Sequence, residues 1–119
     1  MTGLTKTHSG GCHCGAVRYE VEVDLSQVIS CNCSHCSKKG LWLTFAPAAA
    51  FRLTAGEPRL TDYRFNTHKI RHRFCEVCGV QSFAEGEGPQ GPTRAINVRC
   101  LDGVDLTALT PTLVDGRSF

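Results

Sequence analysis

The sequence predicts an all-β fold, and three observations support this class. Apolar and polar residues alternate in several short stretches, which is the period of two that half-buried antiparallel strands produce. No window of ten or more residues has the 3.6-residue apolar period of an amphipathic helix. At 119 residues the chain has the length of one domain, 1–119, with a modest core. We therefore expect a small scaffold of antiparallel sheet.

The clearest alternation covers residues 17–23, where valine and tyrosine alternate with arginine and glutamate. The expected strands, in chain order, are 17–23, 41–45, 51–54, 61–65, 70–74 and 96–100. In the fifth of these, His72 is expected to share an apolar face with Ile70 and Phe74, opposite Arg71 and Arg73. In the sixth, the alternation places Cys100 on the apolar face, where a small buried hydrophobe is the expected role.

The segments between the expected strands contain turn-forming residues. AGEP (55–58) is typical of a turn, and APAAAF (46–51) is expected to form at most one helical turn. EGEGPQGP (85–92) holds three glycines and two prolines, and is expected to be a mobile loop.

Charge and hydropathy exclude several classes of partner. The formal net charge is +2, and basic and acidic residues are interspersed, so the chain offers no field of one sign to bind nucleic acid or an anionic membrane. The N-terminal sequence MTGLTKTHSG lacks the apolar region of a signal peptide, and no run approaches the roughly 20 apolar residues of a spanning helix. We expect a cytoplasmic protein.

In a reducing compartment, the eight cysteines are expected to bind metal rather than to form disulfides. A single residue separates Cys12 from Cys14, and thiols so close in sequence are poor partners in an unstrained disulfide. Such a pair can readily share a metal ion. The same spacing recurs at Cys31 and Cys33.

Two of the cysteine motifs lie at the ends of expected strands and predict a structural zinc site. Cys75 and Cys78 have the CxxC spacing of a zinc knuckle, and the following Gly79 can adopt the positive φ that such turns need. Cys12 and Cys14 supply two more thiols, so that four cysteines would hold one zinc and tie the start of the chain to its middle.

The third motif, CNCSHC, offers three thiols in six residues, from Cys31, Cys33 and Cys36. Catalytic zinc sites commonly have three protein ligands and keep one position for water or substrate. Four residues could instead close this site from within the chain: His35, His68, His72 and Cys100. We expect an open fourth position, because His72 and Cys100 both fall on apolar faces of expected strands.

The motifs GGCHCGAVRYEVE, CNCSHCSKKG and FCEVCGVQSF occur in this order and resemble the cysteine motifs of the glutathione-dependent formaldehyde-activating enzyme family, which also includes centromere protein V-like proteins. The similar part covers about residues 11–100. The resemblance implies a zinc-stapled all-β scaffold related to the fold of the B-type methionine sulfoxide reductases. It also implies two Zn²⁺ per chain, a structural ion at Cys12, Cys14, Cys75 and Cys78 and a catalytic ion at Cys31, Cys33 and Cys36.

The activity that the resemblance implies is that of a carbon–sulfur lyase which joins glutathione to formaldehyde. Zinc with an open position lowers the pKa of a thiol and can orient the thiolate toward a carbonyl carbon. Glutathione carries two carboxylates, so basic side chains are needed near the metal. The candidates are Lys38, Lys39, Arg71 and Arg73.

Two other classes of function remain open on the sequence. The chain could be a non-catalytic zinc module that carries a thiol or binds a protein partner, which a second site closed by Cys100 would favour. It could also be a thiol redox enzyme with Cys100 as nucleophile, beside Arg99. A redox nucleophile must be a reactive, accessible thiolate.

Overall fold

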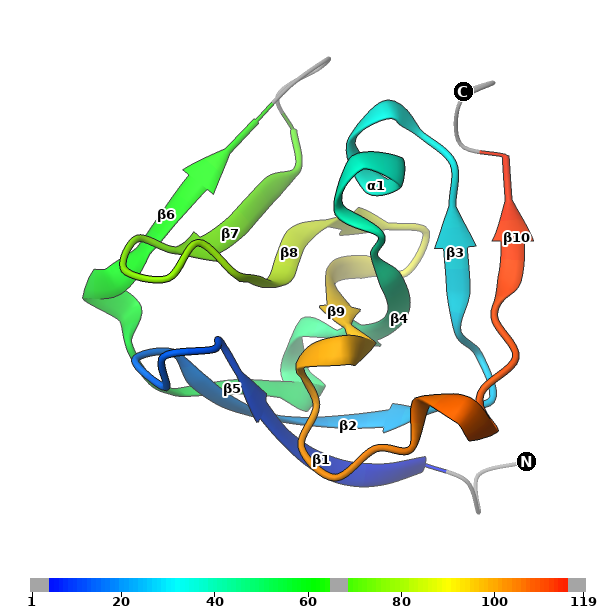
Figure 1. Ribbon diagram of the computed structural model, residues 1–119, viewed down its shortest axis with the longest axis horizontal. Helices are drawn as coiled ribbons and strands as arrows, with labels where there is room; N and C mark the ends of the chain where they lie inside the picture. Colours follow the sequence, from blue (N-terminus) through cyan, green and yellow to red (C-terminus); the bar gives the residue numbers. More distant parts are fainter. Residues whose placement is uncertain (1–4, 65–68, 116–119) are drawn as a thin grey trace.

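A computed structural model describes residues 5–64 and 69–115, and it confirms the all-β class. The described strands form two sheets (Figure 1). The small sheet has the order β1 (Thr5–Gly11), β2 (Arg18–Asp24) and β5 (Phe51–Ala55). The large sheet has the order β10 (Thr112–Val114), β3 (Ile29–Cys31), β4 (Trp42–Pro47), β9 (Gly91–Asn97), β8 (Gln81–Gly88), β7 (Arg71–Cys75) and β6 (Leu60–Tyr63).

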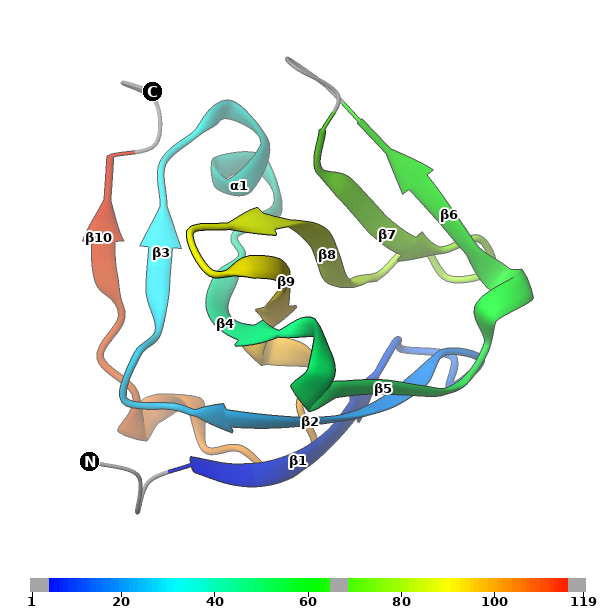
Figure 2. The same cartoon turned by 180° about the vertical axis from the view of Figure 1, so that it is seen from behind.

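All pairings between these strands are antiparallel except that of β10 with β3. The one α-helix among the described residues is α1 (Ser34–Lys39). Both views show the small sheet across the lower part of the molecule and α1 at the opposite end (Figures 1 and 2). No helix in the described ranges is long and apolar enough to cross a membrane.

The core lies between the two sheets. Alternation in β2 directs Tyr19, Val21 and Val23 inward, and each is at most 2 % exposed. They pack against Phe83 of β8 and Ile96 of β9, which come from the large sheet. This confirms the strand expected at 17–23 and shows that its apolar face fastens one sheet to the other.

Both faces of the large sheet are covered near its centre. Thr44 and Ala46 of β4 face the small sheet, whereas Leu43 packs with Cys36 on the side of α1. Phe45 lies on the same face of β4 as Leu43, but it is half exposed. Only the part of that face beneath α1 is protected from water.

In the strand expected at 70–74, two side chains differ from the prediction in burial: Ile70, expected on the apolar face, is 48 % exposed, and Arg73, on the opposite face, is buried. His72 is buried as expected, but Arg73 is also buried, only 6 % exposed. Its guanidinium lies 2.7 Å from Asp62 of β6 and 3.1 Å from Glu85 of β8. A buried charge is tolerated when opposite charges and hydrogen bonds compensate its lost hydration, and these two carboxylates do so.

Two expected segments have a different structure. Strand β9 ends at Asn97, and Val98–Cys100 form a 3₁₀ turn in which the Asn97 side chain accepts a hydrogen bond from the backbone N–H of Arg99 at 3.1 Å. Residues 85–92 are not a loop: β8 and β9 continue through most of them as a hairpin paired to Gly88 and Gly91. The expected helical turn is confirmed as a 3₁₀ turn at Ala48–Ala50.

Candidate metal centres

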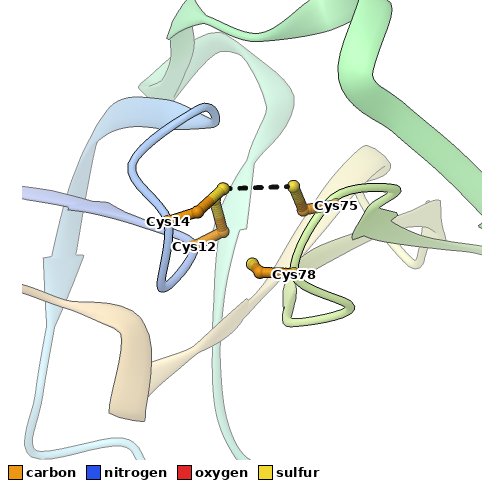
Figure 3. A group of neighbouring side chains, drawn as sticks. All are labelled: Cys12, Cys14, Cys75 and Cys78. Atoms are coloured by element: carbon orange, nitrogen blue, oxygen red, sulfur yellow. Dashed lines mark hydrogen bonds between the residues drawn. The ribbon is translucent and has the colours of Figure 1, made fainter.

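The structure brings Cys12, Cys14, Cys75 and Cys78 together at one point, with their sulfur atoms within 4.8 Å of one another (Figure 3). The first pair follows β1, and the second pair occupies the end of β7 and the turn after it. The Sγ atoms of Cys12 and Cys14 lie 3.6 Å apart, and those of Cys14 and Cys75 lie 3.7 Å apart. Zinc–sulfur bonds of about 2.3 Å in a tetrahedron require sulfur atoms about 3.8 Å apart, so the spacing fits this ion.

Backbone groups prepare this first group of cysteines to carry negative charge. The N–H of Val17 donates to the sulfur of Cys12 at 3.3 Å, and that of Val77 donates to the sulfur of Cys75 at 3.4 Å. Burial alone would raise the pKa of Cys78, but hydrogen bonds led by the backbone N–H of Val80 lower it to about 6. Thiolates are the form that binds metal. The turn also depends on Gly79, whose φ is 81°.

A second group joins Cys31, Cys33 and Cys36, whose sulfur atoms also lie within 4.8 Å of one another. Cys31 ends β3, Cys33 caps the N-terminus of α1, and Cys36 lies in its first turn. The sulfur of Cys33 accepts from the backbone N–H of Cys36 at 3.3 Å. Burial alone would raise the pKa of Cys33, but this hydrogen bond and others lower it, whereas burial raises the pKa of Cys36. The three ligands come from a single short segment.

The fourth position of this group was expected to be open, and the structure shows where the possible ligands lie. Within the described residues, only the three cysteines belong to the group. The ring of His35 instead packs on that of His72, with centroids 4.1 Å apart, and on that of Tyr63 at 5.7 Å. His68 lies outside the described residues.

Cys100 belongs to neither group of cysteines. Its sulfur lies 3.7 Å from the backbone oxygen of Gln81. Burial, with smaller contributions from Cys12 and Cys78, raises the pKa of Cys100 to about 11. A raised pKa disfavours the thiolate form that a redox nucleophile needs.

A cavity of about 450 Å³ opens beside the second group of cysteines. Both Cys31 and Cys36 line it, together with polar residues. Arg99 and Trp42 form one part of the wall, where the guanidinium carbon lies 4.5 Å from the centroid of the indole ring. The sequence alone did not indicate that this pair is part of a site. The single tryptophan close after the cysteine motif was the feature that could have suggested it.

The four basic residues expected near the metal have other surroundings. Arg71 and Arg73 are both bound to Asp62 and Glu85. The ammonium group of Lys39 donates to the side-chain oxygen of Gln81 at 2.9 Å, and Lys38 is exposed. None of the four lines the cavity beside Cys31 and Cys36.

The chain is similar to known proteins both in sequence and in structure. The family model described as glutathione-dependent formaldehyde-activating enzyme matches residues 7–114. Among solved structures, the crystal structure of a Rhodobacter sphaeroides protein from a structural genomics programme is 31 % identical to this chain. The match covers 88 % of this chain and 97 % of that one, with a TM-score of 0.79.

Proposed function

This chain belongs to the glutathione-dependent formaldehyde-activating enzyme family, and we propose that it is a zinc-dependent carbon–sulfur lyase which adds a small thiol to an aldehyde. The single observation that carries the proposal is the group of Cys31, Cys33 and Cys36, three thiols from one segment that border a cavity. Glutathione and formaldehyde are the substrates that the family name suggests.

The two groups of cysteines would hold two zinc ions with different roles. The first group supplies four sulfur ligands from two distant segments, a set that completes tetrahedral coordination and leaves no position for a substrate. Its zinc would be structural. The second group supplies three, so a thiol that enters the adjoining cavity could take the fourth position.

The reaction is the addition R–SH + H₂C=O → R–S–CH₂–OH. A sulfur–carbon bond forms, the π pair of the carbonyl moves to its oxygen, and the thiol proton ends on that oxygen. Bound zinc would supply Lewis-acid chemistry that lowers the pKa of the incoming thiol. The protein residues hold the reactants: Cys31 and Cys36 fix one end of the cavity, and its walls bring the thiol and the carbonyl carbon together.

The charge of the second group suits this task. Three thiolates and one Zn²⁺ carry a net charge of about −1. A fourth cysteine thiolate would make the net charge about −2, and this more negative charge would oppose the approach of a substrate thiolate. Cys100, the cysteine that could have closed the site, is in neither group. This supports an exchangeable fourth ligand.

A cobalt-substituted protein tests the proposal. Glutathione should strengthen the sulfur-to-cobalt charge-transfer absorption, and with formaldehyde the protein should form the hydroxymethyl thioether faster than the uncatalysed reaction, as followed by NMR. The matched control is the Cys36→Ser protein, which should show neither effect. If no small thiol changes the cobalt spectrum of the unmodified protein, the second site is closed and the chain is a zinc-binding module without this activity.

A further inference from the structure

One arginine differs from the others in its surroundings. Arginine side chains in the described part of the chain pair with carboxylates in seven of eight cases: Arg18, Arg52, Arg59, Arg64, Arg71, Arg73 and Arg94. The eighth is Arg99, which has no such ion pair among the described residues and lies on the wall of the cavity beside Cys31 and Cys36. A guanidinium with unused donors in a cavity is suited to bind an anion.

Two contacts hold Arg99 in place before any ligand arrives. Its backbone N–H donates to the side-chain oxygen of Asn97 at 3.1 Å, and the Asn97 amide in turn donates to the backbone oxygen of Gln81 at 2.8 Å. Its guanidinium carbon also lies over the ring of Trp42, 4.5 Å from the centroid, in a cation–π contact. Binding would therefore cost less side-chain entropy than at a freely moving arginine.

The register of two strands places Trp42 beside the segment that holds the second group of cysteines. Trp42 pairs with Ser30 in the register of β3 and β4, and Ser30 directly precedes Cys31. Arg99, which lies over Trp42, therefore lines the same cavity as the segment that holds the second group of cysteines. Asp115 also lines the cavity and accepts a hydrogen bond from Asn32 at 3.0 Å. The wall thus offers both a cation and an anion.

We infer that Arg99, held by Trp42, binds a carboxylate of the thiol substrate. The inference rests on the proposed function, since it assigns the group that positions the thiol of the same reaction. It replaces Lys38, Lys39, Arg71 and Arg73, which were the basic residues expected from the sequence. Arg99 is a binding residue in this scheme, and the cysteines remain the groups nearest to the reacting sulfur.

The test separates the carboxylate from the thiol. S-methylglutathione has both carboxylates of glutathione and no free thiol, whereas 2-mercaptoethanol has a thiol and no carboxylate. Trp42 is the single tryptophan of the chain, so its fluorescence reports binding beside Arg99 without any contribution from the metal. The second probe is followed by the charge-transfer absorption of the cobalt protein.

In the metal-loaded Arg99→Gln protein, we expect the dissociation constant of S-methylglutathione to rise about tenfold to a hundredfold, the range for loss of a hydrogen bond to a charged group. The affinity for 2-mercaptoethanol should stay unchanged. Arg99→Lys should fall between the two, because it keeps the charge and loses the fork. The matched control is Arg52→Gln, which removes an exposed arginine that pairs with Glu20 on the small sheet.

Three results would overturn the inference: S-methylglutathione fails to bind the unmodified protein, binds Arg99→Gln equally well, or loses no more affinity than 2-mercaptoethanol. The last would mean that Arg99 supports the metal group. Failure of the proposed function looks different. In that case S-methylglutathione binds in a manner that depends on Arg99, while no thiol changes the cobalt spectrum.

Discussion

Replacement of Cys78 by serine tests whether the first group of cysteines holds the fold together. The two halves of this group are far apart in the sequence: Cys14 and Cys75 are separated by 61 positions, yet their sulfur atoms lie 3.7 Å apart. A metal bound to both halves closes this long loop in the folded state. Removal of one ligand weakens the cross-link at the end of β7, where Cys75 is fully buried.

The size of the effect follows from the length of the loop. In the chain-entropy estimate, a cross-link that closes about 60 residues contributes about 4 kcal/mol at 25 °C. Domains of this length have a total free energy of unfolding of about 6–18 kcal/mol. Cys78→Ser should therefore lose one zinc per chain and lower the melting temperature by about 10–20 °C, or fail to fold.

Zinc content by elemental analysis and thermal unfolding by circular dichroism measure both effects. Cys100→Ala is the matched control, because it removes a half-buried thiol close to the same group that does not belong to it. This control should keep two zinc ions and its melting temperature within a few degrees. A Cys78→Ser protein with two zinc ions and an unchanged transition would refute the reasoning.

Two further changes probe the side of the large sheet that α1 covers. Cys36→Ser should give a folded protein that lacks the second zinc and shows no response to thiols, because a cross-link within about six residues contributes only about 2 kcal/mol; unfolding as severe as that of Cys78→Ser would contradict this. Burial lowers the pKa of His72 to about 4, so the unfolded state binds more protons between about pH 4 and 6.5, and the free energy of unfolding must fall as the pH falls through this window. Between pH 7 and pH 5, the free energy of unfolding of His72→Gln should fall by about 2 kcal/mol less than that of the unmodified protein, as measured by urea titrations. An equal fall in both proteins would show that His72 is not the group responsible.

The sequence was sufficient to predict the parts of the structure whose determinants are local. Each group of cysteines is built from pairs or triplets that are close in the chain, and the strand at 17–23 carries its apolar alternation within seven residues. The meeting of Cys12 and Cys14 with Cys75 and Cys78 was predicted because zinc requires four ligands and because the motifs resemble those of a known family. The number of ligands that zinc requires thus indicated a contact between segments that are distant in the sequence.

What the sequence did not predict depends on contacts between distant residues. The burial of Arg73 was not predicted, because its compensating carboxylates, Asp62 and Glu85, lie on two other strands. Helix α1 has six residues, too few to show an apolar period of 3.6. The role proposed for Arg99 could not be predicted either, since it depends on Trp42 and on a strand that ends three residues earlier than the alternation suggested.

In the proposed function, the difference between the two groups of cysteines would also account for ligand exchange inside so small a protein. If substrate entered the first group, one of its four sulfur ligands would have to leave, and the cross-link of about 4 kcal/mol would weaken at each turnover. The second group avoids this cost, because its ligands come from one segment and the cap of α1 is held by a backbone hydrogen bond from Cys36 to Cys33. In the proposed function, its fourth position would change while the ligands of the first group stay in place. Two separate sites would then keep the reaction apart from the support of the fold.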